Sequence, residues 1–177
     1  SGTITRTMFA GGTGLGTPLL LTAVLTPVPP WLGLTSAEMM YRDCVNCTSW
    51  APHFFDYCSG SLTSMYMTFS ECTHFNELMV LDTSNVTTMK YMFYNCVNFN
   101  QPVNFNTAKV TNFDRMLAWC SKFNQPVAFD TSKATTLEYM LYSCSKFNQT
   151  INFDATKATT AAYMCYNCAD LNSSVTI

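Results

Sequence analysis

The sequence has few charged residues, and they are not clustered. Charged side chains make up 11% of its 177 residues, with 9 Lys and Arg against 11 Asp and Glu, scattered singly along the chain. A protein that binds nucleic acid through its phosphates needs a basic patch or stripe. We therefore expect no nucleic-acid partner.

Long apolar runs are also missing. The longest run, Leu19–Leu25, includes Thr22 and ends at Thr26-Pro27, whereas a membrane helix needs roughly 20 apolar residues. The sequence therefore predicts no membrane span. Arg6 precedes this run, but no small-x-small cleavage site follows it, so we interpret the segment as mature protein rather than a signal peptide.

Motifs of catalysis and phosphate binding are lacking. The sequence contains no Gly-x-Ser-x-Gly, no His-Glu-x-x-His and no convincing pair of acids. Residues 11–16 are rich in glycine, but no Lys-Ser/Thr follows and no strand pattern precedes them, so a phosphate-binding loop is not indicated. We expect a protein that is not an enzyme and uses no cofactor.

Two cysteine pairs resemble halves of zinc sites. They are Cys44 with Cys47, and Cys165 with Cys168. The only histidines, at positions 53 and 74, do not complete a four-ligand set at a familiar spacing. We therefore predict no metal site.

Cysteines, in contrast, are abundant and regularly spaced. Six of the nine form a series with a first step of 28 and a constant spacing of 24 thereafter: Cys44, Cys72, Cys96, Cys120, Cys144 and Cys168. Repeats with a period of this size are typical of strand-plus-helix solenoids. We expect these six cysteines to form an internal ladder of free, buried thiols that fill space between repeats.

Each repeat has two halves with different apolar spacing. In the first half the apolar positions follow i, i+3, i+4, i+7, as in Met89, Met92, Phe93 and Cys96. This spacing predicts a short helix, and Thr135 with Glu138 fits a capping box at its start. In the second half, apolar residues such as Val103 and Phe105 alternate with polar ones, which predicts a half-buried strand.

The predicted fold is therefore an α/β repeat. Residues 34–177 would form a short right-handed solenoid of about six strand-helix coils, with an insertion near residues 46–53. Residues 1–33 do not match the repeat and would form an apolar arm or cap that contains Gly and Pro. No coil of this kind is stable alone, because each buries its apolar side against its neighbours.

The recurrent pattern Val-Thr-x-Met-x-x-Met-Phe-x-x-Cys-x-x-Phe-Asn-Gln-Pro-Val-x-Phe-Asp-Thr resembles the BspA-like leucine-rich repeats of bacterial and mycoplasma surface proteins. The resemblance covers about residues 34–177. It implies the leucine-rich-repeat fold and an association with adhesion and protein binding. Related repeats also occur in phage proteins.

Several apolar and aromatic residues lie at positions where the predicted core does not need them. On the predicted outer face of the helices lie Tyr91, Tyr94, Trp119, Tyr139, Tyr142, Tyr163 and Tyr166. They would be interface residues, or they would pack over adjacent helices with their hydroxyls in water.

Apolar side chains are also found at the two ends of the repeat region. They are Leu19, Leu20, Leu21, Val24, Leu25 and Trp31 in the arm, and Val175 and Ile177 on the last strand, and we consider all of them possible interface residues. The arm would cap its own first coil or dock on a neighbouring subunit.

Two cysteines flank the predicted insertion and stand outside the ladder. A disulfide between Cys47 and Cys58 would tie the insertion down. Cross-linking to another chain is the alternative.

From these patterns we expect a non-enzymatic structural and interaction protein displayed on a large particle. The favoured role is a virion component, such as a capsid decoration or a tail or neck protein. It would form a homo-oligomer and dock on other protein subunits through its N-terminal arm and its uncapped C-terminal edge. The alternative is a bacterial cell-surface adhesin or lectin-like module that binds a host surface protein or glycan. Its location would be the virion or the cell exterior and surface.

Overall fold

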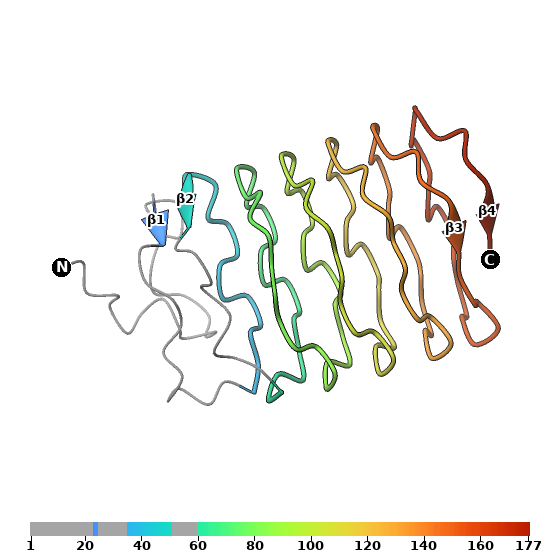
Figure 1. The fold of residues 1–177 in the computed structure, drawn as a ribbon, viewed down its shortest axis with the longest axis horizontal. Helices are drawn as coiled ribbons and strands as arrows, with labels where there is room; N and C mark the ends of the chain where they lie inside the picture. The colour runs from blue at the N-terminus through green and yellow to red at the C-terminus, as the bar shows by residue number, and fades with distance from the viewer. Residues whose placement is uncertain (1–22, 25–34, 51–59) are drawn as a thin grey trace.

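The computed structural model describes residues 23–24, 35–50 and 60–177, which form a row of stacked coils (Figure 1). Parallel bridges join consecutive coils at one position in each: Ser36↔Ser64, Ser64↔Thr88, Thr88↔Asn112, Asn112↔Thr136 and Thr136↔Thr160. Bridged residues are 28 positions apart in the first pair and 24 in the others. The spacing of the cysteines is thus the spacing of the coils.

Four short strands lie near the two ends of the described chain. They are β1 (Ala23–Val24), β2 (Ser49–Trp50), β3 (Ile151–Asn152) and β4 (Val175–Thr176). β1 pairs in parallel with β2, and β3 pairs in parallel with β4 (Figure 1). The main chain of the predicted arm therefore contacts the first coil at β1, and β2 lies inside the predicted insertion.

The predicted helices are wrong, and with them the strand-helix α/β solenoid. The described residues form no helix. In the segment predicted as helical, the amide of Met92 donates to the carbonyl of Met89 at 3.0 Å, whereas the amide of Tyr91 donates to the carbonyl of Asp114 in the next coil at 2.9 Å. Neighbouring residues repeat this alternation. A helix would instead send every amide to the carbonyl four residues back.

These segments are successive tight turns. Twelve non-glycine residues have positive φ, two in each coil and four positions apart: Met39, Asp43, Met67, Glu71, Tyr91, Asn95, Arg115, Trp119, Tyr139, Ser143, Tyr163 and Asn167. Positive φ at the third residue is typical of a type II turn. Inward-facing residues of consecutive turns have the same apolar spacing as one face of a helix, and this is why the spacing was misleading.

The predicted capping box is also wrong. The Thr135 hydroxyl donates to the carbonyl of Thr111 in the preceding coil at 2.9 Å. The amide of Glu138 donates to the hydroxyl of Thr136 at 3.2 Å. These threonines therefore bond to the adjacent coil and hold a local turn, not a helix end.

The predicted strands occur in only part of the second halves. β3 and β4 lie where the prediction put them, but the described coils that contain Pro102 and Pro126 have no strand there. In the coil of Pro102 the amide of Phe105 donates to the carbonyl of Val103 in its own coil at 2.9 Å, whereas the equivalent amide of Phe153 in β3 donates to Thr176 in β4 at 2.9 Å. A local turn thus takes the amide that the ladder would use.

The core consists of side chains stacked in columns along the row of coils. The longest aromatic column contains Phe75, Phe99, Phe123 and Phe147, with successive ring centroids 5.7, 5.9 and 6.0 Å apart. Trp50 closes the first coil, with its ring edge-on to Phe75 at 4.8 Å. Trp50 belongs to the range predicted as an insertion, yet its side chain is buried.

Candidate functional site

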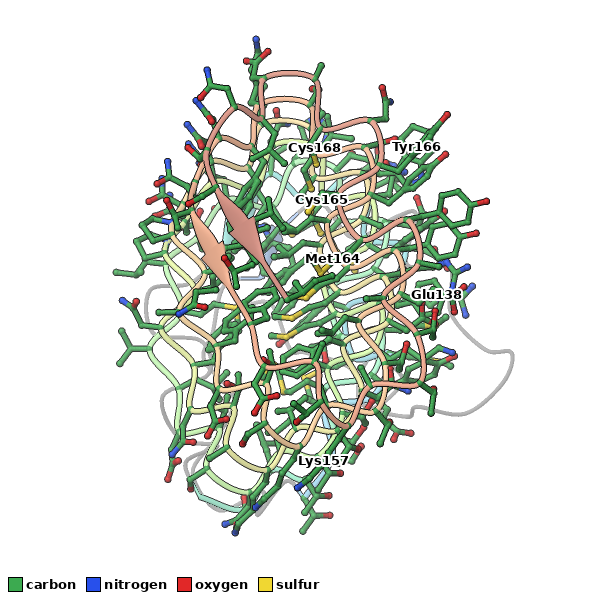
Figure 2. The ribbon with its side chains drawn as sticks, turned by 90° about the vertical axis from the view of Figure 1, so that its right-hand side faces the viewer. Glu138, Lys157, Met164, Cys165, Tyr166 and Cys168 are labelled. Atoms are coloured by element: carbon green, nitrogen blue, oxygen red, sulfur yellow. The ribbon has the colours of Figure 1, made fainter. Side chains whose placement is uncertain are left out.

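The outward-facing turns gather aromatic side chains on one side of the stack. We call this side the aromatic surface, and it comprises Tyr91, Tyr94, Trp119, Tyr139, Tyr142, Tyr163 and Tyr166. Tyr163, Tyr166 and Trp119 are 55%, 57% and 45% exposed, and the other four are half-buried. Figure 2 shows Tyr166 at the outer edge of the last coil, away from the sulfur atoms of the interior.

Four of these tyrosines form a two-by-two cluster. Between coils, Tyr139 stacks on Tyr163 at 5.0 Å and Tyr142 stacks on Tyr166 at 5.4 Å. Within each coil the two rings meet edge to face, at 5.4 Å and 5.7 Å. The repeat thus holds the rings in fixed positions, and little side-chain entropy is left to lose on binding.

An ion cluster supports the middle of the aromatic surface. Asp114 is buried and receives Lys90 Nζ at 3.0 Å and an Arg115 guanidinium nitrogen at 2.6 Å. The Arg115 guanidinium lies 4.2 Å from the ring centroid of Tyr139 and 5.5 Å from that of Tyr91. Arg115 therefore bridges the two groups of tyrosines by cation–π contact.

Sequence reasoning missed Asp114 and Arg115. The available signal was the column of residues 91, 115, 139 and 163, in which a lone arginine interrupts three tyrosines.

On the same surface, burial raises the pKa of Tyr94, and the nearby charge of Glu71 adds to that rise. The hydroxyl of Tyr94 therefore stays protonated near neutral pH and can donate a hydrogen bond to a partner.

The six ladder cysteines are buried and stand one per coil (Figure 2). From the second coil on, each thiol donates to a carbonyl of the preceding coil, as Cys96 does to Phe69 and Cys120 to Phe93, both at 3.0 Å. Burial raises the pKa of these two thiols and of Cys144. Because a thiolate is the reactive form, these inner thiols are structural and not nucleophilic.

In the last described coil, several main-chain donors have no acceptor among the described residues. In the coil before it, amides such as those of Tyr139 and Leu141 donate to the next coil at 3.0 Å and 2.8 Å. The corresponding amides of the last coil belong to Ala161, Tyr163, Cys165 and Asn167, and no acceptor for them is found among the described residues. Val175 and Ile177 on the same coil are 43% and 56% exposed.

The remaining predicted site residues lie partly outside the described chain. Cys47 is buried and its thiol donates to the carbonyl of Ser49 at 3.4 Å, but Cys58 lies outside the described residues. The Cys47–Cys58 disulfide therefore stays a prediction. For the arm, only the main chain of Val24 is described, in β1. The other candidates of the arm lie outside the described ranges: Leu19, Leu20, Leu21, Leu25 and Trp31.

Within residues 23–24, 35–50 and 60–177, no group of three or more His, Cys, Asp or Glu side chains could hold a metal ion. The same part of the chain has no helix long and apolar enough to cross a membrane.

Comparison with known proteins gives one match. The model of a family described as "Mycoplasma protein of unknown function, DUF285" matches residues 63–177. No curated protein matches the chain, and no solved structure does. The match covers most of the stacked coils and all seven residues of the aromatic surface.

Proposed function

Because the chain belongs to the DUF285 family, whose function is unknown, we propose a function for it from its surface. The protein is a non-enzymatic structural and interaction protein that forms homo-oligomers on a large particle. A virion component, such as a capsid decoration or a tail or neck protein, is the setting that we favour. The aromatic surface and the C-terminal coil make the contacts with neighbouring subunits.

The observation that carries the proposal is the exposure of rings that the fold does not need for its core. The core columns are filled by buried phenylalanine and methionine, whereas Trp119, Tyr163 and Tyr166 are about half exposed. Tyrosine and tryptophan are the residues most often found to carry the binding energy of protein interfaces. An interface over the tyrosine cluster would bury rings that are already ordered.

The C-terminal coil adds a second kind of contact. Its amides that have no acceptor among the described residues can donate to main-chain carbonyls of another chain, much as the amides of an exposed sheet edge do when they bind a partner. Val175 and Ile177 provide exposed apolar side chains on the same coil. The low charge of the chain, 11%, adds little electrostatic repulsion between copies.

Light scattering coupled to size-exclusion chromatography tests this proposal. We expect the full chain to run as an oligomer whose mass falls toward the monomer when Tyr163→Ala and Tyr166→Ala are combined. Leu78→Ala with Val80→Ala is the matched control, because these side chains are also exposed but lie outside the aromatic surface. A wild-type chain that stays monomeric at all concentrations would refute the proposal.

A cell-surface adhesin or lectin-like module is the second candidate. The resemblance to BspA-like repeats favours it, as does the ring pair formed by Tyr163 and Tyr166. Here the monomer would bind an immobilised glycan or matrix protein, and the same double variant would lose that binding. Binding by a monomeric chain would therefore favour the adhesin over the particle component.

A further inference from the structure

Cys165 and Cys168 form a thiol pair at the outermost described turn. Their thiols are near enough to shift each other's pKa, and Figure 2 shows both residues on the last coil. In the two preceding coils the residue equivalent to Cys165 is Leu141 or Leu117, and both are fully buried. Cys165 is half-buried, so it is the cysteine in the described coils that solvent reaches best.

The backbone places the two side chains within reach of a disulfide. The amide of Cys168 donates to the carbonyl of Cys165 at 3.3 Å, and Asn167 between them has a φ of 60°. Such a turn brings its first and fourth α-carbons to less than about 7 Å. Disulfides join α-carbons that are about 4.4–6.8 Å apart, so the bond needs little movement of the main chain.

Each thiol of the pair also changes how readily the other ionises. The neighbouring Cys165 lowers the pKa of the Cys168 thiol, while Cys168, together with burial, raises the pKa of the Cys165 thiol. The inner thiol Cys120 has no such partner, and its pKa is raised by burial.

We propose that Cys165 and Cys168 are a modification site that forms a reversible intraturn disulfide by exchange with a low-molecular-weight disulfide. One thiolate of the pair attacks a sulfur of oxidised glutathione, forms a mixed disulfide and releases one glutathione thiolate. The other thiolate then attacks the protein sulfur of the mixed disulfide and releases the second glutathione. The protein loses two electrons and two protons, which the oxidant carries away as two thiols.

The disulfide would close a ring that contains Tyr166 and Asn167. Tyr166 belongs to the aromatic surface and stacks on Tyr142. Oxidation would therefore restrict the outermost tyrosine without changing the inner coils. The site itself is independent of the proposed function, because it depends only on the turn and its two thiols.

Thiol mapping by mass spectrometry tests the site. The reduced full chain is incubated with oxidised glutathione, blocked with N-ethylmaleimide and digested. We expect the peptide that spans residues 165–168 to carry no maleimide and to be lighter than the reduced peptide by two hydrogen atoms. In the reduced chain, Cys120 should react with maleimide at least about tenfold more slowly than Cys165, since a buried thiol needs local opening.

The matched control is Cys165→Leu, which installs the residue of the two preceding coils and should fold normally. In this variant the peptide should not lose two hydrogen atoms, and Cys168 should carry maleimide. The proposal would be overturned if wild-type Cys165 and Cys168 both stay reduced while a free peptide of the same sequence is oxidised. A glutathione adduct on either cysteine that the other cysteine never resolves would overturn it equally.

Discussion

The rings of Phe99 and Phe123 lie 5.9 Å apart with their planes only 2° from parallel, although the two residues belong to different coils. Both side chains are buried. Each inner phenylalanine therefore contacts equivalent rings on both sides, and its packing depends on the regular spacing of the coils. A gap at one position removes contacts from two neighbours.

Replacing Phe123 tests this column. Phe123→Ala should lower the free energy of unfolding by about 3–5 kcal/mol, because it leaves a cavity between two rings. Phe123→Leu installs the residue type of Leu171 in the last coil, and it should lower the free energy of unfolding clearly less than Phe123→Ala does. Urea unfolding measures both values. Equal losses for the two variants would show that the cavity is not the cause.

A second prediction distinguishes a turn from a helix at Trp119. The side chain is 45% exposed and its φ is 66°. Trp119→Gly should be more stable than Trp119→Val by about 1–2 kcal/mol, because positive φ is costly for a residue with a β-carbon. Both variants lose the same indole, so thermal unfolding isolates the backbone effect. In a helix the order would reverse, since glycine is the poorer helix former.

The buried thiols predict a loss of stability at alkaline pH. Burial raises the pKa of Cys96, Cys120 and Cys144 in the folded chain, whereas an unfolded thiol titrates at about 8.5. Above that pH the unfolded state loses protons that the folded state keeps. Each thiol should then lower the free energy of unfolding by up to about 1.4 kcal/mol per pH unit. Below that pH these thiols should contribute no pH dependence.

Denaturant unfolding between pH 7 and pH 10 measures this slope. Cys120→Ala serves as the control, because it should remove the contribution of one thiol from the slope above about pH 8.5. An unchanged slope in that variant would contradict the assignment to buried thiols.

Amide exchange should differ between the last two coils. The amides of Tyr139 and Leu141 donate to the next coil, whereas their counterparts at Tyr163 and Cys165 have no acceptor among the described residues. We expect the second pair to exchange with solvent at least about tenfold faster, because an unbonded amide needs no opening step. Hydrogen exchange followed by NMR checks this. If subunits associate through this coil, raising the protein concentration should slow the exchange of these two amides.

The period and the inward-facing residues could be read from the sequence. Met89, Met92 and Phe93 are buried, as a recurring apolar pattern requires. The pattern did not decide the backbone between them, because side chains that point inward every three or four residues suit both a helix and a series of turns. Asparagine at positions 95 and 167 was a weak signal for the turns, since asparagine tolerates positive φ.

The candidate site was only partly predictable. The outward position of Tyr139 and Tyr163 follows from their place in the repeat, but their stacking at 5.0 Å depends on how closely the coils approach. Trp50 was assigned to an insertion, yet its ring packs in the core. No local pattern marks it, because it contacts Phe75 across the junction between two coils.

The sequence by itself determined the period of the repeat, the column to which each side chain belongs and the family to which the chain belongs, because all three depend only on which residues recur and where. The tertiary structure alone decided that alternate amides donate to the neighbouring coil. A hydrogen bond between the main chains of two coils does not change the spacing of side chains in the sequence. Because these amides donate to the next coil and not to a carbonyl of their own coil, the segment is a series of turns. The contact between Cys165 and Cys168 was decided in the same way, by the turn that folds one toward the other.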